Sequence, residues 1–163
     1  MHGFVTTCLR AFGVKVTTLD INEAYEPDFV GSVLKMPFSD NAFTMSLICE
    51  VLEHLPYDSF SPALKELRRV TERTVLLSLP DVRRTLLSVD VKLPFLKRIR
   101  GIVKAPTFKR HIFDGQHHFE IGKRGYSPRR IRQKIIRAGF VIRKDKVYPD
   151  TPKNHYFVLD NRA

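Results

Sequence analysis

The sequence predicts an α/β fold: a doubly wound, mostly parallel sheet with helices on both faces. Between residues 3 and 80, short apolar runs alternate with helical patterns, which is the order that builds parallel sheets. Residues 42–49 carry no charge, as expected for a strand that is buried on both faces of such a sheet. Near the end of the chain, one helical pattern is followed by two strand patterns, which predicts a C-terminal antiparallel hairpin.

Glycine and alternating apolar residues define the first elements. Residues 3–12 have a helical pattern that stops at Gly13. Residues 14–19 alternate in the manner of a strand, which ends at Asp20. A second short strand is expected at residues 29–34, before the uncharged run described above.

Two serine–proline pairs predict the starts of the later helices. Ser61-Pro62 and Ser127-Pro128 each offer a serine N-cap followed by proline at the first helical position. Apolar residues then recur every three or four positions, which predicts one buried face on each helix. These residues are Ala63, Leu67 and Val70 in the first helix and Ile131, Ile135 and Ala138 in the second. Strands are expected after the helices, at residues 74–79, 140–148 and 155–159.

Length and composition favour a single domain over residues 1–163. Hydrophobic residues make up 43% of the chain, which is typical of a folded domain. Cys8 and Cys49 are too few for a disulfide framework, and their apolar surroundings predict buried, reduced thiols. No apolar run reaches the roughly 18–20 residues of a membrane span, and the N-terminus has no secretory signal pattern. We therefore expect a cytoplasmic protein.

The positive charge is concentrated in the second half of the chain. The net charge is +11. Residues 1–80 hold 7 basic and 10 acidic side chains (net −3), whereas residues 81–146 hold 19 basic and 5 acidic ones (net +14). This asymmetry indicates an anionic partner such as nucleic acid, a phosphorylated metabolite or an anionic lipid surface. A solvated basic surface that only aids solubility is the alternative.

The most specific pattern lies at residues 36–55, MPFSDNAFTMSLICEVLEHL. A proline and an Asp-Asn pair favour a turn, an uncharged strand follows, and Glu50, Glu53 and His54 come directly after that strand. Open α/β sheets bind ligands at the carboxyl ends of their strands. The order of these residues resembles the class I S-adenosylmethionine-dependent methyltransferases of the type 11 group. The resemblance implies a Rossmann-like fold, S-adenosylmethionine as cofactor, and transfer of its methyl group to an unidentified acceptor.

The resemblance also assigns residues to the cofactor. Asp20 would accept hydrogen bonds from both ribose hydroxyls, with Ile21 beside it. Ser32 and Val33 would flank the adenine. The family usually has an acidic residue in place of Ser32, and a hydroxyl accepts a hydrogen bond more weakly than a carboxylate. Glu50 would lie beside the methionine half and offset the charge of the sulfonium. A purely local role for Asp20, capping the next turn, is the alternative.

Four residues are expected on the acceptor side and are the candidates for catalysis: Glu53, His54, His117 and His118. The two later histidines belong to residues 115–122, GQHHFEIG, which resemble a segment found in some members of the family. A neutral imidazole there could take a proton from the acceptor near neutral pH.

Other roles for these residues stay open. Glu53 and His54 could serve only their helix terminus, and the histidines could be structural. Metal binding by His111, His117 and His118 is a further alternative. Neither a cysteine nor an established ligand spacing supports it, so we expect no metal site.

The first part of the resembled family has no counterpart here. The family's central first strand and its glycine-rich turn should precede the helix at Phe4, where only residues 1–3 stand. Gly3 would be the last glycine of that turn, where backbone amides approach the cofactor. We expect a truncated product or a start placed too late, with impaired or lost activity. Direct pairing of the two flanking strands in a smaller sheet is the alternative.

Residues 81–126 interrupt the alternation of strands and helices, and we expect a basic insertion that caps the acceptor side. Within it, residues 86–103 resemble an amphipathic helical face that Pro94 and Gly101 interrupt. The rival function is a non-catalytic methyltransferase-fold module that binds nucleic acid or another anionic partner. Peripheral contact with anionic lipid is a third possibility. The basic residues concerned are Lys97, Arg98, Arg100, Lys104, Lys109, Arg110, Arg129, Arg130 and Arg132.

Overall fold

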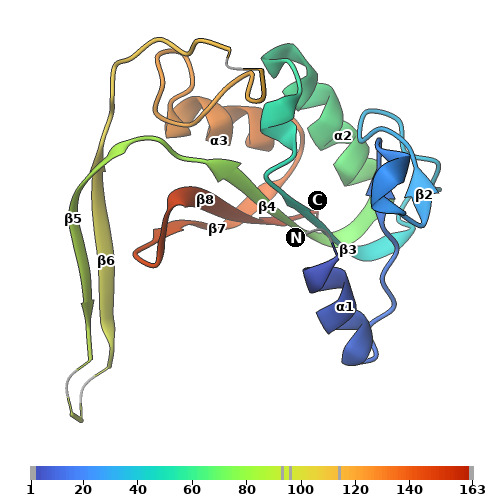
Figure 1. Cartoon of the computed structure of the whole chain (residues 1–163), viewed down its shortest axis with the longest axis horizontal. Helices are drawn as coiled ribbons and strands as arrows, with labels where there is room; N and C mark the ends of the chain where they lie inside the picture. Colours follow the sequence, from blue (N-terminus) through green and yellow to red (C-terminus); the bar gives the residue numbers. More distant parts are fainter. Residues whose placement is uncertain (1–2, 93, 96, 114, 162–163) are drawn as a thin grey trace. The chain divides into compact units, whose positions relative to one another are not determined.

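The computed structural model describes residues 3–92, 94–95, 97–113 and 115–161 (Figure 1). Contacts between residues divide the chain into two compact units, residues 1–38 and 39–163. The fold is mixed α/β with a central sheet and helices, as the sequence predicts. Within the described residues, no helix is long and apolar enough to cross a bilayer.

The N-terminal unit combines one helix with a short parallel sheet. α1 (Phe4–Ala11) forms where the sequence predicts a helix, and the chain leaves it at Gly13, which has a φ of +77°. β1 (Leu19–Asp20) is parallel to β2 (Phe29–Val30). Between them lies the single helical turn η1 (Glu23–Tyr25).

Both strands are shorter than the sequence predicts, because at their ends backbone N–H groups donate to side-chain oxygens and not to a neighbouring strand. Before β1, the N–H of Thr18 donates to Oδ2 of Asp28 at 2.7 Å. After β2, Oγ of Ser32 accepts from the N–H of Leu34 at 3.2 Å and turns the chain. Such local hydrogen bonds offer the backbone an alternative to the sheet.

A four-stranded sheet forms the core of the C-terminal unit, in the order β3-β4-β8-β7. β3 (Phe43–Cys49) is parallel to β4 (Thr71–Pro80). β8 (Thr151–Asp160) runs antiparallel to β4 and to β7 (Val141–Tyr148), so the predicted C-terminal hairpin is confirmed. The parallel pairs are β1–β2 in the N-terminal unit and β3–β4 in the C-terminal unit.

Helices α2 (Phe60–Val70) and α3 (Pro128–Arg137) pack against this sheet and against each other (Figure 1). Ser127 caps α3 as predicted, since its Oγ accepts from the N–H of Arg130 at 3.3 Å. α2 begins before the predicted Ser61, because the turn η3 (Tyr57–Ser59) runs directly into it. All of the predicted apolar face residues of both helices are buried: Ala63, Leu67, Val70, Ile131, Ile135 and Ala138.

The prediction that the strand at residues 42–49 is buried on both faces is wrong. β3 lies at the edge of its sheet, and within the described part of the chain its one strand partner is β4. Ile48 is buried, but Met45 and Leu47 are 54% and 48% exposed and lie on the opposite face. Cys49 is exposed as well, so it is not the buried thiol that its apolar surroundings suggested.

β5 (Arg84–Val91) and β6 (Ile99–Ala105) form an antiparallel hairpin that projects from the sheet (Figure 1). The predicted helical face over residues 86–103 is therefore wrong. The β-branched residues of this stretch favour strands over helices. Pro94 lies in the connection between the strands, where its missing N–H costs no ladder bond.

The centre of β4 should be the most sensitive part of the core. Leu77 is fully buried between β3 and β8, opposite Ile48 and Phe157. We expect Leu77→Ala to lower the free energy of unfolding by about 2–5 kcal/mol, because lost apolar contacts add to the cost of a cavity. Urea denaturation measures this change. The control Leu87→Ala, at a 56% exposed leucine of β5, should stay within about 0.5 kcal/mol. Equal effects at both sites would contradict this core.

Candidate functional site

The candidate site begins where β3 ends. Glu50 leaves the strand with a φ of +53°, so the chain turns sharply there. Its N–H donates to the carbonyl oxygen of Ser78 in β4 at 3.3 Å, and its Oε1 accepts from Oγ of Ser78 at 2.7 Å. The helical turn η2 (Leu52–His54) follows at once. The acidic residues therefore lie at the carboxyl end of a parallel strand.

Glu53, in η2, is a buried carboxylate without a partner. Its side chain is fully buried, and among the described residues neither Oε1 nor Oε2 accepts a hydrogen bond. Burial, joined by the negative charges of Glu50 and Glu120, raises the pKa of Glu53 to about 8. An unsatisfied buried carboxylate destabilises a fold, and such groups cluster at functional sites.

A second segment, residues 115–121, completes the site. The N–H of Ile121 donates to the carbonyl oxygen of Pro80 at 2.9 Å, which fixes this segment to the end of β4. The N–H of His118 donates to the carbonyl oxygen of Glu53 at 2.7 Å, which joins the segment to η2. Residues that are more than 60 positions apart in the sequence thus form one site.

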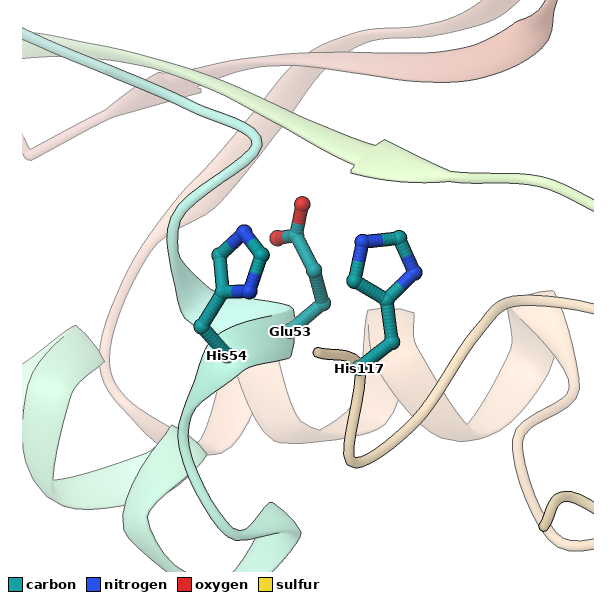
Figure 2. A group of neighbouring side chains, drawn as sticks. All are labelled: Glu53, His54 and His117. Atoms are coloured by element: carbon teal, nitrogen blue, oxygen red, sulfur yellow. The ribbon is translucent and has the colours of Figure 1, made fainter. Parts of the chain in front are cut away.

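His54 and His117 lie on either side of the Glu53 carboxylate (Figure 2). One potential ligand atom from each of the three residues lies within 4.8 Å of the others. Nδ1 of His54 is 3.0 Å from the carbonyl oxygen of Gln116, so this nitrogen must carry the proton. Nδ1 of His117 is 3.3 Å from Oε1 of Glu120. Both contacts place an acceptor at Nδ1, so Nε2 is the ring nitrogen that is not used in them.

The structure does not bring His118 into this cluster. Its ring stacks on Phe113, with the ring centroids 4.4 Å apart. His111 supports the segment from outside, because its Nε2 lies 2.8 Å from the carbonyl oxygen of His117. Three of the four predicted acceptor-side residues therefore meet. Gln116 contributes its backbone carbonyl oxygen, which no side-chain pattern reveals.

Asp20, which the resemblance assigns to the ribose, lies at the end of β1 in the N-terminal unit. Its Oδ1 accepts from the N–H of Asn22 at 2.8 Å, which is the local capping role that the sequence left open. Among the described residues its Oδ2 accepts no hydrogen bond. The neighbouring Ile21 is 76% exposed.

The other residues assigned to the cofactor also lie in the N-terminal unit. Oγ of Ser32 already accepts from the N–H of Leu34, and Val33 is half-buried. Gly3 precedes α1 with a φ of +95°, in the left-handed region that glycine adopts readily. A Cβ placed on Gly3 would meet no described atom within 4 Å, so the backbone is open to a ligand there.

A buried charge network beside the site escaped the sequence reasoning. Asp81 follows β4 directly and is buried with Arg83, Lys104 and His155, whose nitrogens lie 2.6, 3.0 and 3.0 Å from its oxygens. Burial opposes ionisation of Asp81, but the hydrogen bonds from His155, Arg83 and Lys104 outweigh burial and lower its pKa. The sequence offered one signal for this network. An aspartate follows directly after Pro80, which ends a buried strand.

Several of the basic residues proposed for an anionic partner are already paired. Arg98 and Arg100 bind Asp90, and Arg100 also binds Asp150. Lys104 is buried in the network described above, and Arg132 pairs with Asp145. No observation therefore favours the nucleic-acid or lipid reading, which stays a prediction of the sequence.

Comparison with known proteins matches the first half of the chain to one family. Residues 2–79, nearly half of the chain, match the family model described as a methyltransferase domain. No curated protein sequence matches the chain significantly.

Several solved structures share the fold over nearly the whole chain. The PH0226 protein from Pyrococcus horikoshii OT3 is 14% identical with a TM-score of 0.63, covering 98% of this chain and 77% of that one. The Burkholderia thailandensis 1,6-didemethyltoxoflavin-N1-methyltransferase, solved with 1,6-didemethyltoxoflavin and S-adenosylhomocysteine, is 11% identical with a TM-score of 0.63, covering 98% and 66%. An S-adenosylmethionine-dependent methyltransferase from Methanosarcina mazei is 16% identical with a TM-score of 0.64, covering 98% and 87%.

Proposed function

Because residues 2–79 match the methyltransferase-domain family model, we propose that this chain transfers a methyl group from S-adenosylmethionine to an acceptor bound beside Glu53. The observation that carries the proposal is the buried, unpartnered carboxylate of Glu53 at the carboxyl end of β3. The sulfonium of the cofactor is positively charged, so its binding would favour the ionised form of Glu53, which in turn would offset that charge.

The acidic and small residues of the chain suit this cofactor. Asp20 keeps one carboxylate oxygen without a partner, which can accept from a ribose hydroxyl. Ser32 retains a hydroxyl proton and Val33 an apolar surface for the adenine. Gly3 would let the cofactor approach its backbone closely, and Glu50 would add negative charge near the methionine half. When bound, the cofactor supplies the methyl group as an electrophile.

The acceptor would lie against the two histidines of the site. His54 and His117 each hold a proton on Nδ1, which leaves Nε2 as the atom that can accept a proton from the acceptor. His118, which stacks on Phe113, would line the border of the acceptor site. Catalysis would come chiefly from holding the acceptor in line with the methyl group.

Residues 81–126 would cover the acceptor as part of a single methyltransferase domain. The part of this segment that supports the proposal is residues 115–121, which contribute His117 and are hydrogen-bonded to η2 and to β4. The basic surface of the same segment would suit an anionic acceptor.

Substitution of Asp20 tests the cofactor assignment. We expect Asp20→Ala to weaken S-adenosylhomocysteine binding by about 10–100-fold, because a charge-assisted hydrogen bond from a ribose hydroxyl is lost. Equilibrium dialysis measures the affinity. Glu23→Ala, at an exposed glutamate of η1 in the same unit, is the matched control and should bind as the wild type does. Equal affinities for the Asp20 variant and the wild type would remove Asp20 from the site.

A further inference from the structure

Glu53, His54 and His117 form a donor set for a metal ion. One carboxylate and two imidazoles converge from η2 and from residues 115–121 (Figure 2). Their ligand atoms all lie within 4.8 Å of one another. From this geometry we propose that the three side chains bind one divalent transition-metal ion, such as Zn²⁺, Co²⁺ or Mn²⁺. These three side chains also border the acceptor in the proposed function, but ion binding can be measured without methyl transfer.

The donors need only a modest adjustment to close around an ion. Bonds of about 2.0–2.2 Å place the donor atoms of a tetrahedral site roughly 3.3–3.5 Å apart. The present spacing, up to 4.8 Å, is somewhat wider. His54 is exposed, so a small rotation of its ring toward Glu53 displaces no packed core side chain. Glu53 is fully buried and can keep its present position.

The buried carboxylate of Glu53 needs a positive charge. Among the described residues it accepts no hydrogen bond at either oxygen, and no lysine or arginine forms an ion pair with it. Glu50 and Glu120 add further negative charge around it. A divalent cation would be attracted to all three carboxylates and would offset the cost of burying Glu53.

The contacts of the two imidazoles are those that orient metal-binding histidines. Nδ1 of His54 donates to the carbonyl oxygen of Gln116, and Nδ1 of His117 donates to the carboxylate of Glu120. A carbonyl or carboxylate in that position fixes the ring and makes its other nitrogen a better ligand. Glu120 thereby becomes a positioning residue for His117.

The two imidazoles also distinguish a metal ion from other cations. An imidazole nitrogen gives its lone pair to an ion with vacant coordination positions, which a sulfonium or an ammonium group does not have. Magnesium and calcium prefer oxygen ligands, whereas zinc and its first-row neighbours accept imidazole readily. Three protein ligands leave at least one position open, which a water or a hydroxyl oxygen of a small molecule can take.

Titration of the untagged full chain with Zn²⁺ and Co²⁺ tests the proposal. We expect one ion per chain by calorimetry, visible absorption from bound Co²⁺, and a higher Tm in the presence of Zn²⁺, because the ion binds the folded state. Absence of saturable binding of both ions would overturn the site. Binding of Mg²⁺ as tight as that of Zn²⁺ would overturn the assignment to a transition metal. Because the readout is ion binding, failure here leaves the S-adenosylhomocysteine test unaffected.

Variants assign the ligands. Glu53→Gln, His54→Ala and His117→Ala should each weaken Co²⁺ binding by about tenfold or more, and Glu120→Gln should weaken it by about 10–100-fold. His118→Ala is the matched control, since this neighbouring histidine lies outside the cluster, and it should bind as the wild type does. Circular dichroism checks the fold of each variant. If a buried substitution prevents folding, His54→Ala, at an exposed position, decides: unchanged affinity there would overturn the proposal.

Discussion

Replacing Asp81 with asparagine should lower the free energy of unfolding by about 3–5 kcal/mol. Asp81 is buried and receives hydrogen bonds from Arg83, Lys104 and His155. Asparagine keeps the shape of the side chain but removes its charge. Lys104 then stays buried without a counter-charge, and His155 keeps only Asp145. An uncompensated buried charge is among the most destabilising single changes known in proteins.

Urea denaturation near pH 6 measures this effect. The matched control is Asp90→Asn, which removes the same charge from an ion-pair cluster on the exposed hairpin β5–β6. Exposed ion pairs contribute little, so the control should change stability by less than about 1 kcal/mol. Similar losses of unfolding free energy for the two variants would mean that Asp81 does not hold a buried charge network together.

The difference in unfolding free energy between the wild type and Asp81→Asn should depend on pH, because the pKa values of Asp81 and His155 are shifted in opposite directions. The pKa of Asp81 is lowered below 3.8, so its stabilising charge is fully present above pH 3.8 and is lost as the pH falls through the folded-state pKa. The pKa of His155 is raised above 6.5 by hydrogen bonds to Asp145 and Asp81 that outweigh burial. Its stabilising charge is fully present below pH 6.5 and is lost as the pH rises. The stability difference should therefore peak between these limits, and a monotonic rise with pH would contradict the network.

Glu53→Gln should lower the rate of methyl transfer by about 10²–10³-fold, which is the usual cost of removing one preorganised charge from an active site. The substitution leaves the size of this buried side chain nearly unchanged, so no cavity is expected. The rate is measured as tritium transferred from methyl-labelled S-adenosylmethionine to acceptors in a metabolite extract.

Glu72→Gln is the control for this substitution. Glu72 is an exposed glutamate of β4, and its side chain contacts Arg73 and Thr44. The same chemical change there should leave the transfer rate within about twofold of the wild type. A Glu53→Gln protein that is folded and as active as the Glu72 variant would remove Glu53 from catalysis.

The parts of the fold that depend on local sequence could be predicted. The apolar spacing of α2 and α3 and the cap at Ser127 determine helices whether or not their surroundings are known. The resemblance at residues 36–55 agreed with the later family match, because strand, turn and acidic residues occur there in a specific order. The expected single domain and cytoplasmic location stay predictions.

The parts of the fold and of the site that depend on residues distant in the sequence could not be predicted. An uncharged run such as β3 has the same composition in the middle of a sheet and at its edge, so exposure of Met45 and Leu47 was not foreseeable. Linear spacing grouped His111, His117 and His118, whereas the fold selects Glu53, His54 and His117 from two distant segments. Burial of Asp81 with Lys104 and His155 likewise depends on strands that meet only in the folded chain.

Calorimetric titration of the wild-type chain with S-adenosylhomocysteine tests the central claim most directly. The account predicts saturable binding of one molecule per chain, because Asp20, Gly3 and the acidic end of β3 provide groups suited to the ribose, the backbone contact and the sulfur-bearing half. Adenosine alone should bind more weakly, since it lacks the part that would lie near Glu50. A chain that folds, as circular dichroism would show, and gives no binding heat with S-adenosylhomocysteine at millimolar concentration would contradict the account.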